Sequence, residues 1–462
     1  MTEFRLPPIK LGDRTPEAHS PKVWVKGHDN ARTRLLADPA LRRVYETLID
    51  YAHSIHSTNS TLSGWGSGGG LTLNANDGVR QEKKIPVPDP KLFRDKIIAK
   101  FNQAFPNLSY SFAVCQNGQL TPDRAYAIGK ARGYNSNDGP SQDLTLDQPM
   151  HVASVSKALT AATVLKSIET FGIDLDAKVW NFFPARWKMS VNSKFAELSF
   201  RHCLQLTTTI SGEAGESTAI SSIREWYTKG ELNGGTINVP DLGMKQVYNN
   251  VSIGLFRIAL MYISSHPLQL TRLEAAIKSL SNDDYMNYCD IVASDFYRIV
   301  VRNAILSPCG VGQADVSPIP SEPDKQTLYY PSPLPQPSVP GGSIGDWTLI
   351  SGGGGWFIST RDLAAFWAHL RFGTVVSGAV KKLLFPSSGL SCGLGVGSVK
   401  GGLSYFRNGD LRISGAGAGC YALLSDLPGG IQLALTSNQR VSANPGGAIG
   451  SIISQAYGES WA

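Results

Sequence analysis

The chain has 462 residues, a length that suits two or three domains. Hydrophobic residues make up 42% of the sequence and charged residues 17%, which supplies a sizeable core and excludes a wholly disordered chain. No stretch approaches 18 uninterrupted apolar residues, so we expect no membrane-spanning helix.

The net charge of +6 is small for this length, and Lys and Arg are scattered. We expect no nucleic-acid partner, because such a partner usually requires basic residues concentrated on one element. The opening residues contain no apolar segment of the kind that directs secretion, which predicts a cytoplasmic protein. The six cysteines and eight histidines show no zinc-binding spacing. We therefore expect free, buried thiols, no metal and no organic cofactor.

Residues 1–90 are predicted to be an extension. Apolar residues recur near helical spacing from about Ala31 to His56, which predicts a helix. Residues 57–70 are rich in Ser and Gly and predict a flexible loop.

A helix near Pro90–Phe105 and two strands are expected next. Leu108–Gln116 is rich in β-forming residues and ends at Asn117-Gly118, a dipeptide typical of hairpin turns. The partner strand is predicted at Ala125–Ile128.

The centre of the chain predicts helices. A long, mostly apolar helix begins near Ser154 and stops at Gly172. The following residues, 173–310, are predicted to be mainly helical, notably at 251–264, 270–280 and 291–306. Residues 307–340 hold nine of the 27 prolines and predict a surface connector.

The last third predicts a helix at Thr360–Phe372 and short strands at 402–406, 419–425 and 431–437. Strands at both ends of the chain, with a helical block between them, predict an α/β fold. We expect an antiparallel sheet flanked by helices, built from both chain ends, with an inserted mostly helical domain. The predicted division is an α/β domain at 91–150 plus 341–462 and a helical domain at 151–340.

One short motif carries chemistry. Ser154 and Lys157 form the only S-x-x-K in the chain, and residues three apart share one face of a helix. A serine hydroxyl needs a base to take its proton, and a lysine serves as that base only when its pKa falls from about 10.4. Burial and the positive end of a helix dipole both lower it. The apolar residues that follow Lys157 predict a buried helix, which favours this reading over a capping serine and an exposed lysine.

Four sequence blocks resemble the penicillin-recognising serine hydrolases, the group of class C β-lactamases, DD-peptidases and related esterases and acyltransferases. The blocks are residues 151–184, 198–212, 242–260 and 351–366, in that order. The resemblance covers roughly 90–462. It implies the β-lactamase/transpeptidase-like fold and an acyl-enzyme mechanism.

The resemblance implies a role for each matching residue. Ser154 resembles the acylated nucleophile, and Lys157 resembles its activating partner. Tyr248 resembles the second general base, and Asn250 resembles the residue that orients the substrate and Lys157. Tyr285-Met286-Asn287 is a second Y-x-N, but the residues around Tyr248 fit the family better.

The third family motif, a K-T-G or H-T-G on an edge strand, is matched by Ile413-Ser414-Gly415, which lacks the cation. Lys400-Gly401-Gly402 is an alternative with poorer spacing. Loss of the cation argues against recognition of a substrate carboxylate. Small residues here would let a substrate lie close to the strand, and the N–H of Ala416 would complete an oxyanion pair with that of Ser154.

Two other hypotheses remain open. Gly341–Gly345 satisfies G-x-S-x-G and is followed by Asp362 and His369, which would define a hydrolase of another fold. We disfavour it, because a proline-rich segment precedes the serine and the other two residues fall on one predicted helix. The second is a non-catalytic binding protein with a decayed site.

The sequence therefore predicts a serine hydrolase that acts through an acyl-enzyme on a small-molecule ester or amide. An esterase or acyltransferase is favoured, and an amide hydrolase of the β-lactamase or D-amino-acid peptidase type is the alternative. The sequence gives no indication of the oligomeric state.

Overall fold

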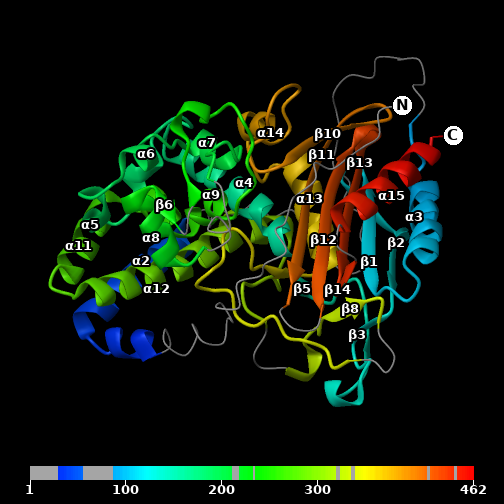
Figure 1. The fold of residues 1–462 in the computed structure, drawn as a ribbon, viewed down its shortest axis with the longest axis horizontal. Helices are drawn as coiled ribbons and strands as arrows, with labels where there is room; N and C mark the ends of the chain where they lie inside the picture. Colours follow the sequence, from blue (N-terminus) through cyan, green and yellow to red (C-terminus); the bar gives the residue numbers. More distant parts are fainter. Residues whose placement is uncertain are drawn as a thin grey trace.

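The computed structural model describes residues 30–55, 87–210, 218–232, 235–318, 323–334, 339–413, 417–441 and 445–461. Its centre is a largely antiparallel sheet with the strand order β10-β11-β12-β13-β1-β2, seen edge to edge on the right of Figure 1. Two short strands, β8 and β14, join this sheet beside β12. The sheet is built from β1 (Tyr110–Gln116), β2 (Gln119–Ile128), β8 (Tyr330–Ser332), β10 (Gly395–Val399), β11 (Gly402–Arg412), β12 (Gly419–Leu427), β13 (Ile431–Ser437) and β14 (Gln439–Val441).

Helices cover both faces of the sheet. α3 and α15 lie side by side on the outer face, and α13 and α4 lie on the other face, toward the helical half of the molecule (Figure 1). The helices and their bounds are α2 (Pro39–Ser54), α3 (Pro90–Ala104), α4 (Ser156–Thr170), α5 (Ala185–Lys188), α6 (Ser193–Ala196), α7 (Phe200–Leu204), α8 (Ile220–Lys229), α9 (Val251–Gly254), α10 (Phe256–Ser264), α11 (Pro267–Ile277), α12 (Asn282–Val301), α13 (Thr360–Arg371), α14 (Gly378–Leu384) and α15 (Pro445–Glu459).

Three further two-stranded ladders lie outside the main sheet. They pair β3 (Lys130–Arg132) with β4 (Gln142–Asp143), β5 (Met150–His151) with β9 (Phe357–Ile358), and β6 (Glu231–Leu232) with β7 (Gly235–Thr236). The second of these ladders ends immediately before Ser154, so it ties the predicted nucleophile to the segment that leads into α13.

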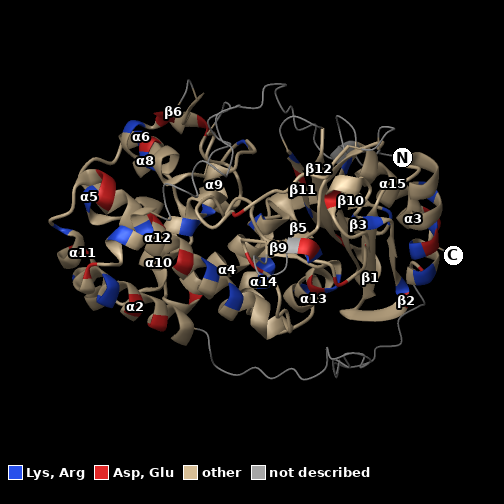
Figure 2. Ribbon diagram, turned by 90° about the horizontal axis from the view of Figure 1, so that it is seen from below, with Lys and Arg blue, Asp and Glu red and all other residues tan. Residues whose placement is uncertain are grey.

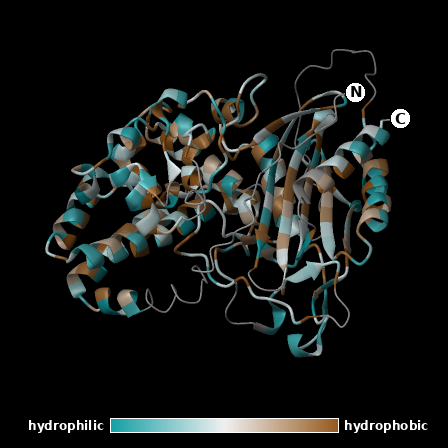
Figure 3. Cartoon of the chain, in the orientation of Figure 1, coloured by the Kyte–Doolittle hydropathy of each residue, from teal (hydrophilic) through white to brown (hydrophobic). Residues whose placement is uncertain are grey.

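The predicted fold class is confirmed: strands from both chain ends share one sheet, and a mostly helical part separates them in sequence. β1 is buried on both faces, as its apolar sequence requires. Phe112 and Val114 pack against α3 and α15, whereas Ala113 and Cys115 pack into the central core. Figure 3 shows the same layering as apolar positions along the central strands. The turn at Asn117-Gly118 has positive φ at both residues, as the hairpin prediction requires.

Several predicted boundaries need correction. β11 runs to Arg412 rather than to residue 406, β2 begins at Gln119, and β10 and α15 were not predicted. The predicted helix at Ala31–His56 is broken before Pro39, because Asp38 caps a new helix there and accepts two backbone N–H bonds. The predicted loop at 57–70 lies outside the described residues.

The described N-terminal residues pack against the helical part. Leu41 and Leu48 of α2 are buried, and the Leu41 carbonyl accepts a bond from the Tyr288 hydroxyl of α12 at 2.6 Å. Arg34 forms an ion pair with Asp284 at the start of the same helix. Within residues 30–55, α2 therefore packs as a layer on α11 and α12.

A buried ion pair joins α10 to α12. Arg257 and Asp290 are almost fully buried and in contact, and Arg257 also bonds Ser294 Oγ at 2.6 Å and the Thr218 carbonyl at 2.9 Å. The Thr218 hydroxyl in turn donates a hydrogen bond to the Ile350 carbonyl, with 2.5 Å between the two oxygens. This chain of bonds links the helical core to the segment that enters the glycine run at 352–355.

Asp290→Ala is expected to lower the free energy of unfolding by about 3–5 kcal/mol, because it leaves the Arg257 guanidinium buried without its counter-charge. Chemical denaturation of both proteins measures this difference. Asp283→Ala is the matched control, since Asp283 is exposed in the first turn of the same helix, and it is expected to cost less than about 1 kcal/mol. Equal losses in the two variants would contradict the assignment.

Positive and negative charges are mixed along the helices (Figure 2). Figure 2 shows Lys and Arg interspersed with Asp and Glu over the helical part and along α3. Within the described ranges, no single helix is long and apolar enough to cross a membrane, although α9–α10 and α11 meet such a criterion as a pair bent by 112°.

Candidate active site

The predicted nucleophile stands on a strained turn. Ser154 lies in a 3-10 turn, Ala153–Val155, which connects β5 to α4. Ala153 has φ +45°, a left-handed conformation that non-glycine residues rarely adopt and that the surrounding structure must hold. Ser154 is half-buried, while the helix that follows it is buried along almost its entire length.

Four of the predicted residues come together around this turn. Ser154 Oγ lies 2.5 Å from the Tyr248 hydroxyl and 2.9 Å from Lys157 Nζ. Lys157 Nζ also donates to Tyr248 OH at 3.0 Å, to Asn250 Oδ1 at 2.6 Å and to the Gly353 carbonyl. Lys157 is fully buried, and its ammonium lies 5.1 Å from the centre of the Tyr248 ring. Residues far apart in sequence thus form one continuous hydrogen-bonded group.

The donors of Lys157 Nζ and the acceptors around it determine which proton transfers are possible at the site. A lysine ammonium has three N–H donors, and the oxygens of Asn250 and Gly353 can only accept. Two donors therefore face these oxygens, and the third direction faces the hydroxyls of Ser154 and Tyr248. When the amine is neutral, the same direction holds its lone pair. Lys157 is thus placed either to take a proton from a hydroxyl or to stabilise an oxyanion of Tyr248.

The glycine run fixes Lys157 from the side opposite Tyr248. Thr160 Oγ1 holds the Gly352 carbonyl at 2.7 Å, one turn along α4 from the lysine. A Cβ on Gly352 would stand 2.9 Å from the Gly254 carbonyl, and one on Gly353 would stand 2.9 Å from that of Asn250. Only glycine lets this backbone pass between α4 and α9. The sequence reasoning placed the run beside a helix start but did not predict its carbonyl as a lysine partner.

Strand β11 closes the site from the sheet. A Cβ on Gly409 would stand 2.4 Å from the Val152 carbonyl and 2.8 Å from the Ser154 nitrogen. The strand therefore lies directly against the serine turn, and β10 pairs with β11 only as far as Phe406. The edge-strand position opposite the serine is thus occupied by residues 407–409.

Arg407 was missed by the sequence reasoning. It is a buried cation on β11, and its Nε donates to the Gly393 carbonyl at 2.8 Å, with Nη2 directed at the same oxygen. Burial lowers the pKa of Arg407, and a negative charge on the nearby Tyr248 oxygen, in its phenolate form, would oppose that shift. Arg407 is thus a cation on the same strand, outside the Ile413-Ser414-Gly415 match, and the expectation about that match stays a prediction. The sequence signal for this cation is Arg407-Asn408-Gly409, which begins one residue after the predicted strand 402–406.

Gly409→Val is expected to reduce the reactivity of Ser154 by about 100-fold, since the added side chain would displace the turn that carries Ser154 and a 1 Å misplacement has an effect of that size. Activity is measured below the melting temperature of the variant. Gly378→Val is the control, because a Cβ there meets nothing within 4 Å. An active Gly409→Val protein would show that β11 does not support the nucleophile.

The remaining predicted residues lie elsewhere or are not described. Residues 414–416, with the predicted oxyanion donor Ala416 and its neighbours Ser414 and Gly415, lie outside the described residues, so their roles stay predictions. Tyr285 lies on α12 and donates to Glu274 at 3.0 Å, which separates it from the Ser154 group. Lys400 stands 5.4 Å from the centre of the Trp461 ring, in the turn between β10 and β11.

The G-x-S-x-G alternative gains no support. Ser343 lies in an irregular segment, with no helix in the residues that follow it directly. Asp362 and His369 both lie on α13. A nucleophile elbow requires a strand–serine–helix turn, which this segment does not form.

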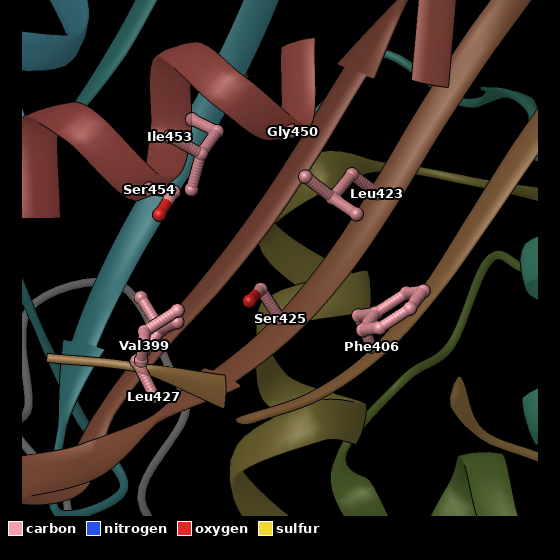
Figure 4. A pocket seen from close by; sticks show the side chains of 8 residues that line it. All are labelled: Val399, Phe406, Leu423, Ser425, Leu427, Gly450, Ile453 and Ser454. Atoms are coloured by element: carbon pink, nitrogen blue, oxygen red, sulfur yellow. The ribbon is translucent and has the colours of Figure 1, made fainter. Parts of the chain in front are cut away.

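In the part of the chain that the structure describes, no three His, Cys, Asp or Glu side chains cluster closely enough to hold a metal ion. All six cysteines are free and buried. Figure 4 shows a small pocket between the sheet and α15, away from the Ser154 group. It contains no titratable side chain, so it offers no acid or base, and it is lined by Val399, Phe406, Leu423, Ser425, Leu427, Gly450, Ile453 and Ser454.

The sheet with its flanking helices and the serine and lysine at the start of α4 define the fold of a penicillin-recognising serine hydrolase. Residues 94–270 match the family model described as Beta-lactamase, so the resemblance seen in the sequence is confirmed and the chain has a β-lactamase-family serine hydrolase fold. A comparison with curated proteins found no match.

Solved structures show the same fold at low sequence identity. A D-amino acid amidase from Ochrobactrum anthropi SV3 is 14% identical, with a TM-score of 0.56 over 80% of this chain and 99% of that one. A β-lactamase/D-alanine carboxypeptidase from Yersinia pestis is 13% identical, with a TM-score of 0.54 over 80% and 98%. A penicillin-binding protein homologue from Pyrococcus abyssi is 15% identical, with a TM-score of 0.52 over 78% and 75%.

Proposed function

We propose that the protein is a serine hydrolase that forms an acyl-enzyme on Ser154 and acts as an esterase or acyltransferase on a small-molecule substrate. The observation that carries the proposal is the contact of a half-buried Ser154 hydroxyl with both Tyr248 and a fully buried Lys157. A partly exposed nucleophile in contact with a buried lysine and a half-buried tyrosine is an arrangement suited to acyl transfer.

The proposed reaction has two steps. Ser154 Oγ attacks the substrate carbonyl, and its proton passes to the Tyr248/Lys157 pair, which returns it to the departing alcohol or amine. The N–H of Ser154, at the start of the turn into α4, faces the developing oxyanion. A water or another hydroxyl then attacks the acyl-enzyme and loses its proton to the same pair, which returns a proton to Ser154 Oγ as the bond between that oxygen and the acyl carbon breaks.

The surroundings of Arg407 favour an ester or acyl-transfer substrate over one bearing a carboxylate. Binding a carboxylate in the bidentate manner requires an exposed guanidinium fork. Arg407 is buried, and its Nε and Nη2 point at one carbonyl oxygen. The cation therefore supports the site electrostatically without presenting its fork to a ligand.

Amide hydrolysis is the second candidate, because the structural relatives include a D-amino acid amidase and a β-lactamase/D-alanine carboxypeptidase. Intact-mass spectrometry separates the two. The protein is incubated with short-chain esters, acyl thioesters, β-lactams and D-amino acid amides, and quenched in acid. We expect acyl adducts from esters or thioesters. Adducts from the lactams or amides alone would favour the second candidate, and no adduct from any donor would favour a non-catalytic protein.

A further inference from the structure

His151 is a buried histidine three residues before Ser154 that the proposed mechanism does not use. Its ring is fully buried, with the ring centres of Trp347 and Phe357 at 4.5 and 5.0 Å. Its backbone N–H donates to the Tyr329 hydroxyl at 2.8 Å, and β5 pairs it with Phe357 of β9. Both the main chain and the ring are therefore held in place.

The two ring nitrogens of His151 differ. Nδ1 accepts the backbone N–H of Ala153 at 3.1 Å, so the ring proton lies on Nε2, which has no partner among the described residues. Burial lowers the pKa of His151 to about 3, so the ring is neutral at neutral pH and Nδ1 remains an acceptor. Nδ1 also lies 3.8 Å from Cys420 Sγ, and burial raises the pKa of that thiol, so the thiol stays protonated and leaves Nδ1 an acceptor.

An apolar ring would fit this place at lower cost. A buried N–H without a partner lowers stability, and a phenylalanine between the same aromatic rings would avoid that loss. The hydrogen bond that His151 Nδ1 accepts from the Ala153 N–H offsets this loss, and it acts on the turn that carries Ser154. Ala153 has φ +45°, a conformation that non-glycine residues rarely adopt and that persists only where neighbours impose it.

We propose that His151 is a positioning residue for the nucleophile: its Nδ1 holds the Ala153 turn and thereby keeps Ser154 within reach of Lys157 and Tyr248. The inference rests on the proposed serine hydrolase function and deepens it. The Ser154 hydroxyl bonds to Lys157 and Tyr248. His151 therefore acts through the Ala153 backbone rather than as a base.

Two substitutions separate the acceptor from the ring. In His151→Asn, the side-chain oxygen stands as many bonds from Cα as Nδ1 does, and asparagine readily accepts from the N–H two residues ahead. In His151→Phe, an aromatic ring still fills the place, but the Nδ1 acceptor is lost. The assay is the second-order rate of labelling by a fluorophosphonate, in which the Ser154 oxygen bonds to phosphorus, fluoride leaves and the proton passes to the Tyr248/Lys157 pair.

We expect His151→Phe to slow labelling by about 10- to 100-fold and His151→Asn to stay within about threefold of wild type, even where the asparagine variant melts at a lower temperature. A phenylalanine variant as reactive as wild type, or reactivity that follows melting temperature in both variants, would overturn the inference. A wild-type protein that takes no label would overturn the proposed function, and this inference with it.

A measurement on the wild-type chain tests the inference independently of variant folding. Nitrogen-15 NMR of labelled histidine is expected to show one ring that stays neutral with the proton on Nε2 from pH 5 to 8. The signal is assigned to His151 by its loss from the spectrum of His151→Phe. A His151 ring with its proton on Nδ1, or one that titrates in this range, would contradict the proposed bond to Ala153.

Discussion

Ser154→Ala is expected to reduce hydrolysis of p-nitrophenyl esters by at least about 1,000-fold, to the background rate. The change removes the oxygen that forms the acyl-enzyme, and no other group in the site replaces that covalent bond. Lys157 keeps its bonds to Tyr248, Asn250 and the Gly353 carbonyl, so the fold is expected to persist.

The matched control for this substitution is Ser343→Ala, which changes the serine of the G-x-S-x-G sequence. We expect it to retain nearly full activity. The measurements are steady-state rates and thermal melting of both variants. Wild-type turnover by Ser154→Ala would end the nucleophile assignment, and loss of turnover only in Ser343→Ala would move it to the other motif.

Tyr248→Phe is expected to lower kcat/KM by about 100- to 10,000-fold, the range that positioned general acid–base groups contribute. The change removes only the hydroxyl that lies 2.5 Å from Ser154 Oγ and 3.0 Å from Lys157 Nζ, and it keeps the ring beside the ammonium. The measurement is kcat/KM for a p-nitrophenyl ester.

Tyr285→Phe is the control, because it removes a hydroxyl from the competing Y-x-N. That hydroxyl bonds Glu274 in the helical part, so its loss is expected to lower stability slightly and leave kcat/KM nearly unchanged. A larger loss of activity in Tyr285→Phe than in Tyr248→Phe would show that the wrong tyrosine was assigned.

The sequence predicted the architecture where apolar patterning is strong. β1, β12 and β13 are mostly apolar strands, and α4 is a mostly apolar helix, so their positions followed from the residues alone. α15 was missed because its sequence is rich in glycine, and its helix packs on the sheet through residues such as Ile453 and Tyr457. Tertiary packing there overrides weak helix propensity.

The C-terminal end of β11 was predicted wrongly for a different reason. Asn408, Gly409 and Asp410 are residue types depleted in strands, so the propensity argument ended the strand before them. In the structure Gly409 makes room for the serine turn, and Asp410 forms a paired contact with Arg440, with Nε–Oδ1 at 2.9 Å. Local rules fail here because the site requires these residues.

Within the site, spacing predicted only local relations. Ser154 and Lys157 lie on one helical turn, and their contact follows from a separation of three residues. The partnership of Lys157 with the Gly353 carbonyl, and that of His151 with the Ala153 turn, depend on backbone geometry that residue types do not reveal. Those contacts could be identified only from the three-dimensional structure.

The most direct test of the central claim is to locate the covalent adduct. The wild-type chain is labelled with a fluorophosphonate, digested and sequenced by tandem mass spectrometry, with Lys157→Met as a second sample. The expected result is one adduct on Ser154 in the wild type and at least about 100-fold slower labelling without the lysine. An adduct on another serine, or equal labelling rates in the two proteins, would contradict the account.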